Sequence, residues 1–159
     1  MADKPVVIKQ FNIGLDVGRK IEEGGIKTKL YLGVQGNDVK MAKKALDKMV
    51  FDRLVKEPTV SVTEVKLYDI TKGKDGFFSG VAEVDLVSDD FRSFVNIILR
   101  YGPSAFEISE PPSVKLGSDE MHAIAGDACD FAHMYSQQII AMFKDPERMA
   151  LYQKMLKGE

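Results

Sequence analysis

Hydrophobic and polar residues alternate along two stretches of the chain, as is typical of β-strands with one buried face. Between residues 26 and 34 every second side chain is apolar or β-branched, and Lys27, Lys29 and Tyr31 fall between them. Residues 82 to 86 repeat the pattern, with acidic residues at the intervening positions. A period of two predicts a sheet with one covered and one open face.

Two further stretches repeat their apolar residues at the spacing of an α-helix. The first helix is expected to start at Asn37 or Asp38 and to end before Pro58. The second is capped by Ser88-Asp89-Asp90 and stopped by Gly102-Pro103. Its inner face is predicted to consist of Phe91, Phe94, Val95, Ile98 and Leu99.

Further strands are predicted at residues 59–70 and 104–108, and the turn 72–76 joins the first of these to the strand around residues 82–86. Residues 26–111 therefore follow the order strand, helix, strand, strand, helix, strand. This order predicts an α+β protein of the ferredoxin-like, split βαβ type, in which two helices pack on one face of an antiparallel sheet.

Two additions flank this core, and the chain is expected to form a single domain over residues 1–159. Residues 5–25 are expected to form an extra N-terminal strand and a charged, glycine-rich loop, which joins that strand to the next one as a hairpin. Residues 117–157 are predicted to form two C-terminal helices, which start at Ser118 and Pro146.

The second half of the predicted core also resembles part of a known protein family. Its residues are Asp75-Gly76, Val81-Ala82-Glu83-Val84, Phe91-Arg92-Ser93-Phe94-Val95 and Leu99-Arg100-Tyr101-Gly102-Pro103-Ser104-Ala105-Phe106-Glu107-Ile108-Ser109-Glu110-Pro111. With its helix, Gly-Pro turn, strand and final Glu-Pro, the segment 75–111 resembles the C-terminal extension of WYL-domain transcription regulators. The resemblance implies a ferredoxin-like fold and a sensing or oligomerising module. The chain departs from those regulators because it has no recognisable helix-turn-helix and no WYL domain.

A second similarity, to RNA-recognition modules, depends on Lys29-Leu30-Tyr31-Leu32-Gly33-Val34 and Lys74-Asp75-Gly76-Phe77-Phe78. It implies RNA binding on the open sheet face, through Tyr31 and the neighbouring lysines. The paired stacking aromatics of such modules are missing, because residues 80–84 read Gly-Val-Ala-Glu-Val. RNA binding is therefore the least favoured function.

The composition is that of an ordinary soluble protein. The 159 residues are 45% hydrophobic and 29% charged, which suits a substantial core without metal or disulfide crosslinks. The formal net charge of -2 disfavours non-specific binding to nucleic acid. The single cysteine, Cys129, excludes an internal disulfide and fits a reducing cytoplasm. The start, Met1-Ala2-Asp3-Lys4-Pro5, has no apolar stretch for export, and no window reaches the length of a membrane span.

The only cysteine and both histidines lie on the long helix that starts at Ser118. Cys129 and His133 are one turn apart on the same face, with Asp130 beside them, so these three are the candidates for thiol-dependent catalysis. His122, Asp130 and His133 are the candidate metal ligands, although about 16 Å of helix separates the two histidines. The small apolar neighbours favour a structural Cys129 packed in a core.

The same helix carries an apolar stripe that is longer than packing on one sheet requires. It consists of Met121, Ile124, Ala125, Ala128, Phe131, Ala132, Tyr135, Ile139 and Met142. The stripe either covers the remaining sheet surface or meets its copy in another subunit. We therefore expect a homo-oligomer, built through this helix or through the pairing of edge strands.

Ligand-binding residues are less well indicated. Arg19, Lys20 and Lys74 lie in or beside two glycine-rich loops that offer backbone amides to an anion, and Tyr31 lies on the open sheet face. Both loops lack the spacing of phosphate-binding motifs, and hairpin turns explain their glycines.

We expect a homo-oligomeric module that binds a small-molecule ligand or regulates, without catalysis. The alternatives are a metal- or thiol-dependent enzyme that uses the face of Cys129, Asp130 and His133, and an RNA-binding module. The sequence identifies no cofactor and no ligand.

Overall fold

The computed structural model describes residues 4–157 and confirms an α+β protein. The chain divides into two compact units, Met1–Lys115 and Leu116–Glu159. The first unit contains the sheet, and the second contains two helices. A single domain over the whole chain stays a prediction.

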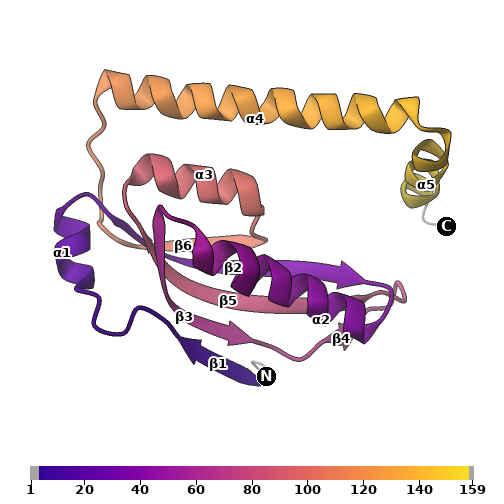
Figure 1. Cartoon of the computed structure of the whole chain (residues 1–159), viewed down its shortest axis with the longest axis horizontal. Helices are drawn as coiled ribbons and strands as arrows, with labels where there is room; N and C mark the ends of the chain where they lie inside the picture. Colours follow the sequence, from indigo (N-terminus) through magenta and orange to yellow (C-terminus); the bar gives the residue numbers. More distant parts are fainter. Residues whose placement is uncertain (1–3, 158–159) are drawn as a thin grey trace. The chain divides into compact units, whose positions relative to one another are not determined.

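The first unit is built on an antiparallel sheet, which has six strands in the described part of the chain (Figure 1). The strands are β1 (Val7–Gln10), β2 (Ile26–Gly36), β3 (Val60–Leu67), β4 (Thr71–Lys72), β5 (Phe78–Ser88) and β6 (Ala105–Glu110). Their order is β1-β3-β5-β2-β6, and the short β4 pairs with β5. The two longest strands, β2 and β5, therefore lie side by side at the centre of the sheet.

Helical segments cover one face of this sheet. They are α2 (Val39–Asp47), the π-helical turn η1 (Lys48–Arg53), the 3₁₀ turn η2 (Leu54–Lys56) and α3 (Phe91–Tyr101). Leu46, Leu54 and Ile97 from these segments join Leu30 and Val84 of the sheet in one hydrophobic core. The alternation along residues 26–34 is confirmed, because its apolar positions point into this core and its lysines do not.

The predicted helix ends are confirmed by their caps. The Asp38 side chain accepts a hydrogen bond from the Met41 N–H at 2.8 Å, and the Asp90 side chain accepts one from the Ser93 N–H at 2.7 Å. Gly102 ends α3 with a φ of 52°, in the left-handed region that glycine tolerates best. Local sequence signals thus set both ends of α3.

The inner face of α3 differs from the prediction. Phe94 is buried as expected, and Ile97 and Tyr101 are buried with it. The other predicted residues are only partly covered, namely Phe91, Val95, Ile98 and Leu99. Tyr101 takes the inner position because its hydroxyl donates a hydrogen bond to Glu57 Oε1 at 2.7 Å. A tyrosine can occupy a buried position when its hydroxyl is hydrogen-bonded, and the spacing of apolar residues alone did not predict this for Tyr101.

The predicted N-terminal hairpin is wrong. Strand β1 pairs with β3 rather than β2, and the expected loop contains a helix, α1 (Val17–Glu22). Gly25 is buried at the end of this helix, where an added Cβ would lie 2.7 Å from the Lys20 carbonyl oxygen and 3.0 Å from that of Ser88. The glycine is therefore required by a close backbone approach and not by a hairpin turn.

The second unit consists of α4 (Ser118–Lys144) and α5 (Pro146–Lys157), as predicted. No residue of α4, which lies wholly within the described part of the chain, is buried. Gly158, near which α5 was also expected to end, lies outside the described residues, as do Met1, Ala2 and Asp3. Within residues 4–157, no helix combines the length and apolarity that crossing a bilayer requires.

Candidate ligand-binding site

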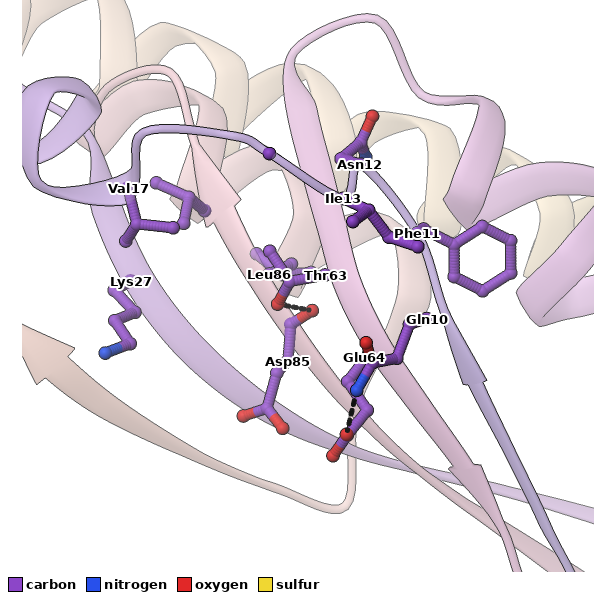
Figure 2. A pocket seen from close by; sticks show the side chains of 12 residues that line it. Gln10, Phe11, Asn12, Ile13, Val17, Lys27, Thr63, Glu64, Asp85 and Leu86 are labelled. Carbon is purple, nitrogen blue, oxygen red and sulfur yellow. Dashed lines mark hydrogen bonds between the residues drawn. The ribbon is translucent and has the colours of Figure 1, made fainter.

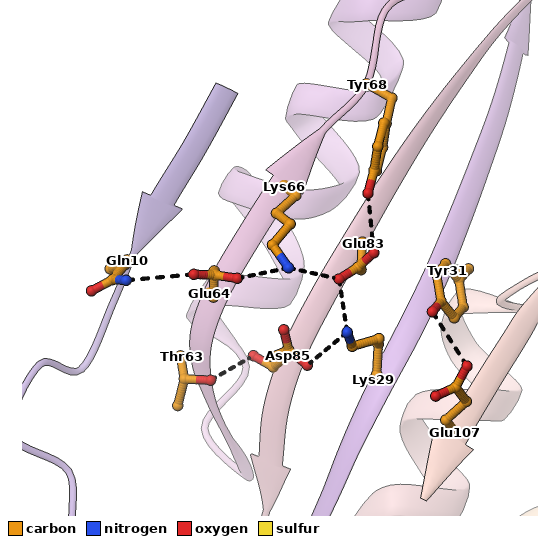
Figure 3. A network of polar contacts seen from close by, with 10 residues as sticks. All are labelled: Gln10, Lys29, Tyr31, Thr63, Glu64, Lys66, Tyr68, Glu83, Asp85 and Glu107. Atoms are coloured by element: carbon orange, nitrogen blue, oxygen red, sulfur yellow. Dashed lines mark hydrogen bonds and ion pairs between the residues drawn. The ribbon is translucent and has the colours of Figure 1, made fainter. Parts of the chain in front are cut away.

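A network of charged and hydroxyl groups occupies the open face of the sheet (Figure 3). Glu83 on β5 lies at its centre and accepts hydrogen bonds from Lys29 Nζ at 2.9 Å, Lys66 Nζ at 2.9 Å and the Tyr68 hydroxyl at 3.1 Å. Lys66 also pairs with Glu64 at 3.0 Å. Side chains from three neighbouring strands thus meet at one carboxylate.

A β-bulge in β3 places two of these residues. The register with β5 shifts between Val62 and Glu64, so that Glu64 lies opposite Asp85 and Lys66 lies opposite Glu83. Without the extra residue, Glu64 and Lys66 would share the covered face with Val62. The bulge therefore moves two charges from the core to the open face.

The network shifts the pKa values of its members. Burial alone would raise the pKa of Glu83, but hydrogen bonds from Lys29, Lys66 and Tyr68 outweigh it and lower the pKa to about 2. The same hydrogen bond to Glu83 raises the pKa of Lys29. Burial raises the pKa of Asp85 above its ordinary value, although Lys29 and Lys66 act in the opposite direction. Asp85 is thus the carboxylate whose charge the network compensates least.

A pocket of about 440 Å³ lies beside Asp85, between the sheet and the segment that follows β1 (Figure 2). Its size falls in the range of small-molecule sites. Its apolar lining comes mainly from Phe11, Ile13, Val17 and Val87, and its polar lining from Gln10, Asn12, Lys27, Thr63, Glu64 and Asp85.

The segment over the pocket is anchored at two points. The Asn12 side chain donates a hydrogen bond to the Val62 carbonyl at 2.7 Å, and its backbone has a φ of 48°, which asparagine tolerates. The Phe11 ring packs against Phe51, with ring centroids 6.1 Å apart. Between these anchors and α1, Ile13 is 87% exposed at the rim of the pocket. The pocket thus offers an apolar rim above an acidic floor.

The polar side chains that line the pocket differ in how closely they pair with neighbouring residues. Glu64 pairs with Lys66 and accepts a hydrogen bond from Gln10 at 3.4 Å, and Lys27 pairs with Glu110 at 3.1 Å. The ion pair between Asp85 and Lys29 is longer, at 3.9 Å. Asp85 can therefore accept hydrogen bonds from a ligand at little cost to the network. A cationic group would also compensate the charge of this partly buried carboxylate.

The ligand-binding candidates from the sequence lie elsewhere. Arg19 pairs with Glu23 at 2.8 Å, Lys20 Nζ donates to Ser61 Oγ at 3.0 Å, and the Tyr31 hydroxyl donates to Glu107 at 3.3 Å. Lys74 is exposed in the turn between β4 and β5.

None of the four lines the pocket, as far as the described residues define it. Their part in ligand binding stays a prediction. Sequence reasoning missed the pocket because its roof depends on the pairing of β1 with β3, for which the chain has no local signal.

The expectation of a buried Cys129 is wrong, because the structure leaves this thiol exposed. His122, Asp130 and His133 are exposed on α4 as well. At about 100° per residue, both histidines project away from the apolar stripe and Cys129 lies at its edge, about 40° from Ala125, so small neighbours in the sequence do not enclose the thiol. Among residues 4–157, no three or more His, Cys, Asp or Glu side chains are grouped so that they could hold a metal ion.

A family model matches residues 27–155, which extend from β2 into α5. The chain belongs to the MJ0538 family. The matched region contains the polar network and the whole of α4, whereas the segment over the pocket precedes it. No curated protein and no solved structure matches the chain significantly. The resemblance to the extension of WYL-domain regulators stays a prediction.

Proposed function

We propose that this member of the MJ0538 family is a homo-oligomeric, non-catalytic module that binds a small amphipathic cation in the pocket beside Asp85. The observation that carries the proposal is the pocket itself, which combines an apolar rim at Ile13 and Val17 with the least compensated carboxylate of the network. The ligand's cationic group pairs with Asp85, and its apolar part covers Ile13. A regulatory role would follow if occupancy altered the exposed segment over the pocket.

The core of the first unit is, in this proposal, ferredoxin-like. Support comes from the strand order β6-β2-β5-β3. Counted along the chain from β2 and without the short β4, these are the fourth, first, third and second strands of two strand-helix-strand units, and they lie next to one another in that order. The covered face carries α2 and α3, and the open face carries the candidate site. A cytoplasmic location is also part of the proposal and depends on the single cysteine.

The charge of the open face argues against RNA as the ligand. Lys29 and Lys66 are both engaged by Glu83, and the Tyr31 hydroxyl is engaged by Glu107. A phosphate backbone approaching this face would meet carboxylates at its centre, where RNA-binding sheets present aromatic and basic groups.

The test is a pair of NMR titrations of the full chain labelled with ¹⁵N. 2-Phenylethylamine and phenylacetate share an aromatic body and carry opposite charges. The amine is expected to shift the amides of Ile13, Val17 and Val87, and phenylacetate is not. At about 10 mM, the titration detects a binding free energy of about -3 kcal/mol.

Asp85→Asn should remove the response to the amine. The matched control is Asp52→Asn, because Asp52 is an exposed carboxylate on η1 and does not line the pocket. Equal shifts from both probes, no shift from either, or an unchanged response in Asp85→Asn would each refute the cationic-ligand proposal. Native mass spectrometry of protein purified from its own source measures the subunit number and any retained ligand.

A further inference from the structure

The pocket beside Asp85 is also lined by a positive side chain, Lys27, to which the proposed function assigns no role. Lys27 lies on β2, and no other lysine or arginine lines the pocket within the described part of the chain. Figure 2 shows Lys27 and Asp85 projecting from neighbouring strands. Both residues belong to the first unit of the chain. The pocket therefore offers a ligand a cation as well as an anion.

The strand register sets the separation of these two charges. Lys27 lies directly opposite Val87 of β5, and Asp85 is two residues away from Val87 on the same strand. Residues related in this way are diagonal neighbours on one face of a sheet and lie about 7–8 Å apart. Val87 shares that face and also lines the pocket. A small ligand can thus contact both charges beside an apolar wall.

Both charges have partners that a ligand can replace or share. Lys27 Nζ pairs with Glu110 Oε1 at 3.1 Å, and the two side chains are 43% and 51% exposed, so this ion pair is weak. An ammonium group has three N–H donors, and Lys27 can therefore bind a second carboxylate without releasing Glu110. The ion pair of Asp85 is long, at 3.9 Å, whereas Glu64 pairs with Lys66 at 3.0 Å. Lys27 and Asp85 are therefore the two charges of the pocket that are most open to a ligand.

We infer that the ligand of this pocket is a zwitterion, namely an amino acid with an apolar side chain, and that Lys27 selects it by binding its carboxylate. This inference rests on the proposed function and specifies the class of the cationic ligand. The ligand's ammonium group pairs with Asp85, and its apolar side chain contacts Ile13 and Val17 at the rim. An amine without a carboxylate leaves the charge of Lys27 uncompensated beside its own ammonium group, and the pocket therefore discriminates against it.

Three amines test the role of the carboxylate in ¹⁵N NMR titrations of the full chain at pH 7. 2-Phenylethylamine carries the ammonium group and the aromatic ring. L-Phenylalaninol adds a neutral hydroxymethyl group beside the ammonium group, and L-phenylalanine carries a carboxylate at that position instead. L-Phenylalanine is expected to bind about fivefold more tightly than either of the others, which is the upper range for a partly exposed ion pair. L-Phenylalaninol controls for the size of the added group.

Lys27→Gln removes the proposed partner of the carboxylate. It is expected to weaken the binding of L-phenylalanine about fivefold and to tighten that of 2-phenylethylamine, because a positive charge beside the ligand's ammonium group is lost. The matched control is Lys40→Gln, which makes the same change at an exposed lysine of α2 that does not line the pocket. Neither dissociation constant should change more than about twofold in this control.

Glu110→Gln provides a second variant that leaves Lys27 in place. It releases Lys27 from its exposed ion pair and should tighten the binding of L-phenylalanine, because the ligand's carboxylate no longer shares the ammonium group. The amide spectrum of each variant without ligand confirms that the fold is intact. Weaker binding of L-phenylalanine to Glu110→Gln would contradict the role of Lys27.

The outcomes separate this inference from the proposed function. Shifts from 2-phenylethylamine without tighter binding of L-phenylalanine overturn the zwitterion and leave the cation site in place. A preference for L-phenylalanine that persists in Lys27→Gln, or an equal gain from L-phenylalaninol, also overturns the inference, because the gain then does not come from the charge pair with Lys27. No shift from any of the three amines refutes the proposed function, and the zwitterion with it.

Discussion

Replacing Glu83 with glutamine is expected to destabilise the sheet by about 3 kcal/mol at pH 7. Glutamine has the shape of the protonated acid, so the substitution resembles permanent protonation. The surrounding lysines and Tyr68 hold the pKa of Glu83 at about 2, against an ordinary value of 4.5. A difference of that size corresponds to about 3 kcal/mol in favour of the carboxylate. Glu83 is only 8% exposed, so solvent screens little of this interaction.

The effect depends on pH in a defined direction. Because the folded state lowers the pKa of Glu83, the stabilisation is fully present above the ordinary value of 4.5 and is lost as the pH falls towards 2. The difference between the variant and the natural protein should therefore shrink to about 1.5 kcal/mol at pH 3. Other carboxylates titrate in both proteins and cancel in the comparison.

Urea denaturation at pH 7 and pH 3 measures both quantities. Amide NMR signals of β3 and β5 report the unfolding of the sheet separately from that of α4. Glu107→Gln is the control, because it makes the same chemical change on the same face at an exposed residue, and it should cost less than about 0.5 kcal/mol. A loss below about 1 kcal/mol for Glu83→Gln at pH 7, or a loss that is equal at both pH values, would refute the reasoning.

Three further substitutions test the fold by urea denaturation at pH 7. Gly25→Ala should cost at least about 1 kcal/mol, because its Cβ would meet the Lys20 carbonyl oxygen at 2.7 Å; an unchanged midpoint would contradict this close approach. Ile97→Ala should cost about 2–5 kcal/mol and Leu99→Ala clearly less, and the reverse order would restore the inner face predicted from the sequence. Asp90→Ala should cost about 1 kcal/mol through the lost cap, whereas Asp90→Asn should retain most of it.

The parts of the fold that the sequence predicted well have short-range causes. Asp38 and Asp90 cap helices within three residues of themselves, and Gly102 ends α3 at its own backbone. The alternation in β2 and β5 depends on the pleat of each strand and not on its partner. These signals suffice for the order of the long strands and helices between residues 26 and 111, whereas the two-residue β4 was not predicted.

The N-terminal error has a long-range cause. A strand followed by glycines and charges is compatible with a hairpin, and also with a strand that pairs with a distant partner. In the structure Val7 lies opposite Leu67, and residues 17–22 form a helix between β1 and β2. No residue near β1 specifies β3 as its neighbour, so the pocket roof could not be predicted from this segment alone.

The candidate site was missed for a further reason, which lies in β3. Strict alternation places Glu64 and Lys66 on the same face as Val62. The sequence alone therefore predicts either two charged side chains on the covered face or a poorly formed strand. The bulge after Val62 inverts the rest of the strand, which buries Val65 and exposes both charges to Glu83 and Asp85. One inserted residue thus adds Glu64 and Lys66 to the network of Lys29, Glu83 and Asp85, and places Glu64 beside Asp85 on the acidic floor of the pocket. The residue that breaks the sequence pattern therefore completes the open face on which the proposed binding site lies.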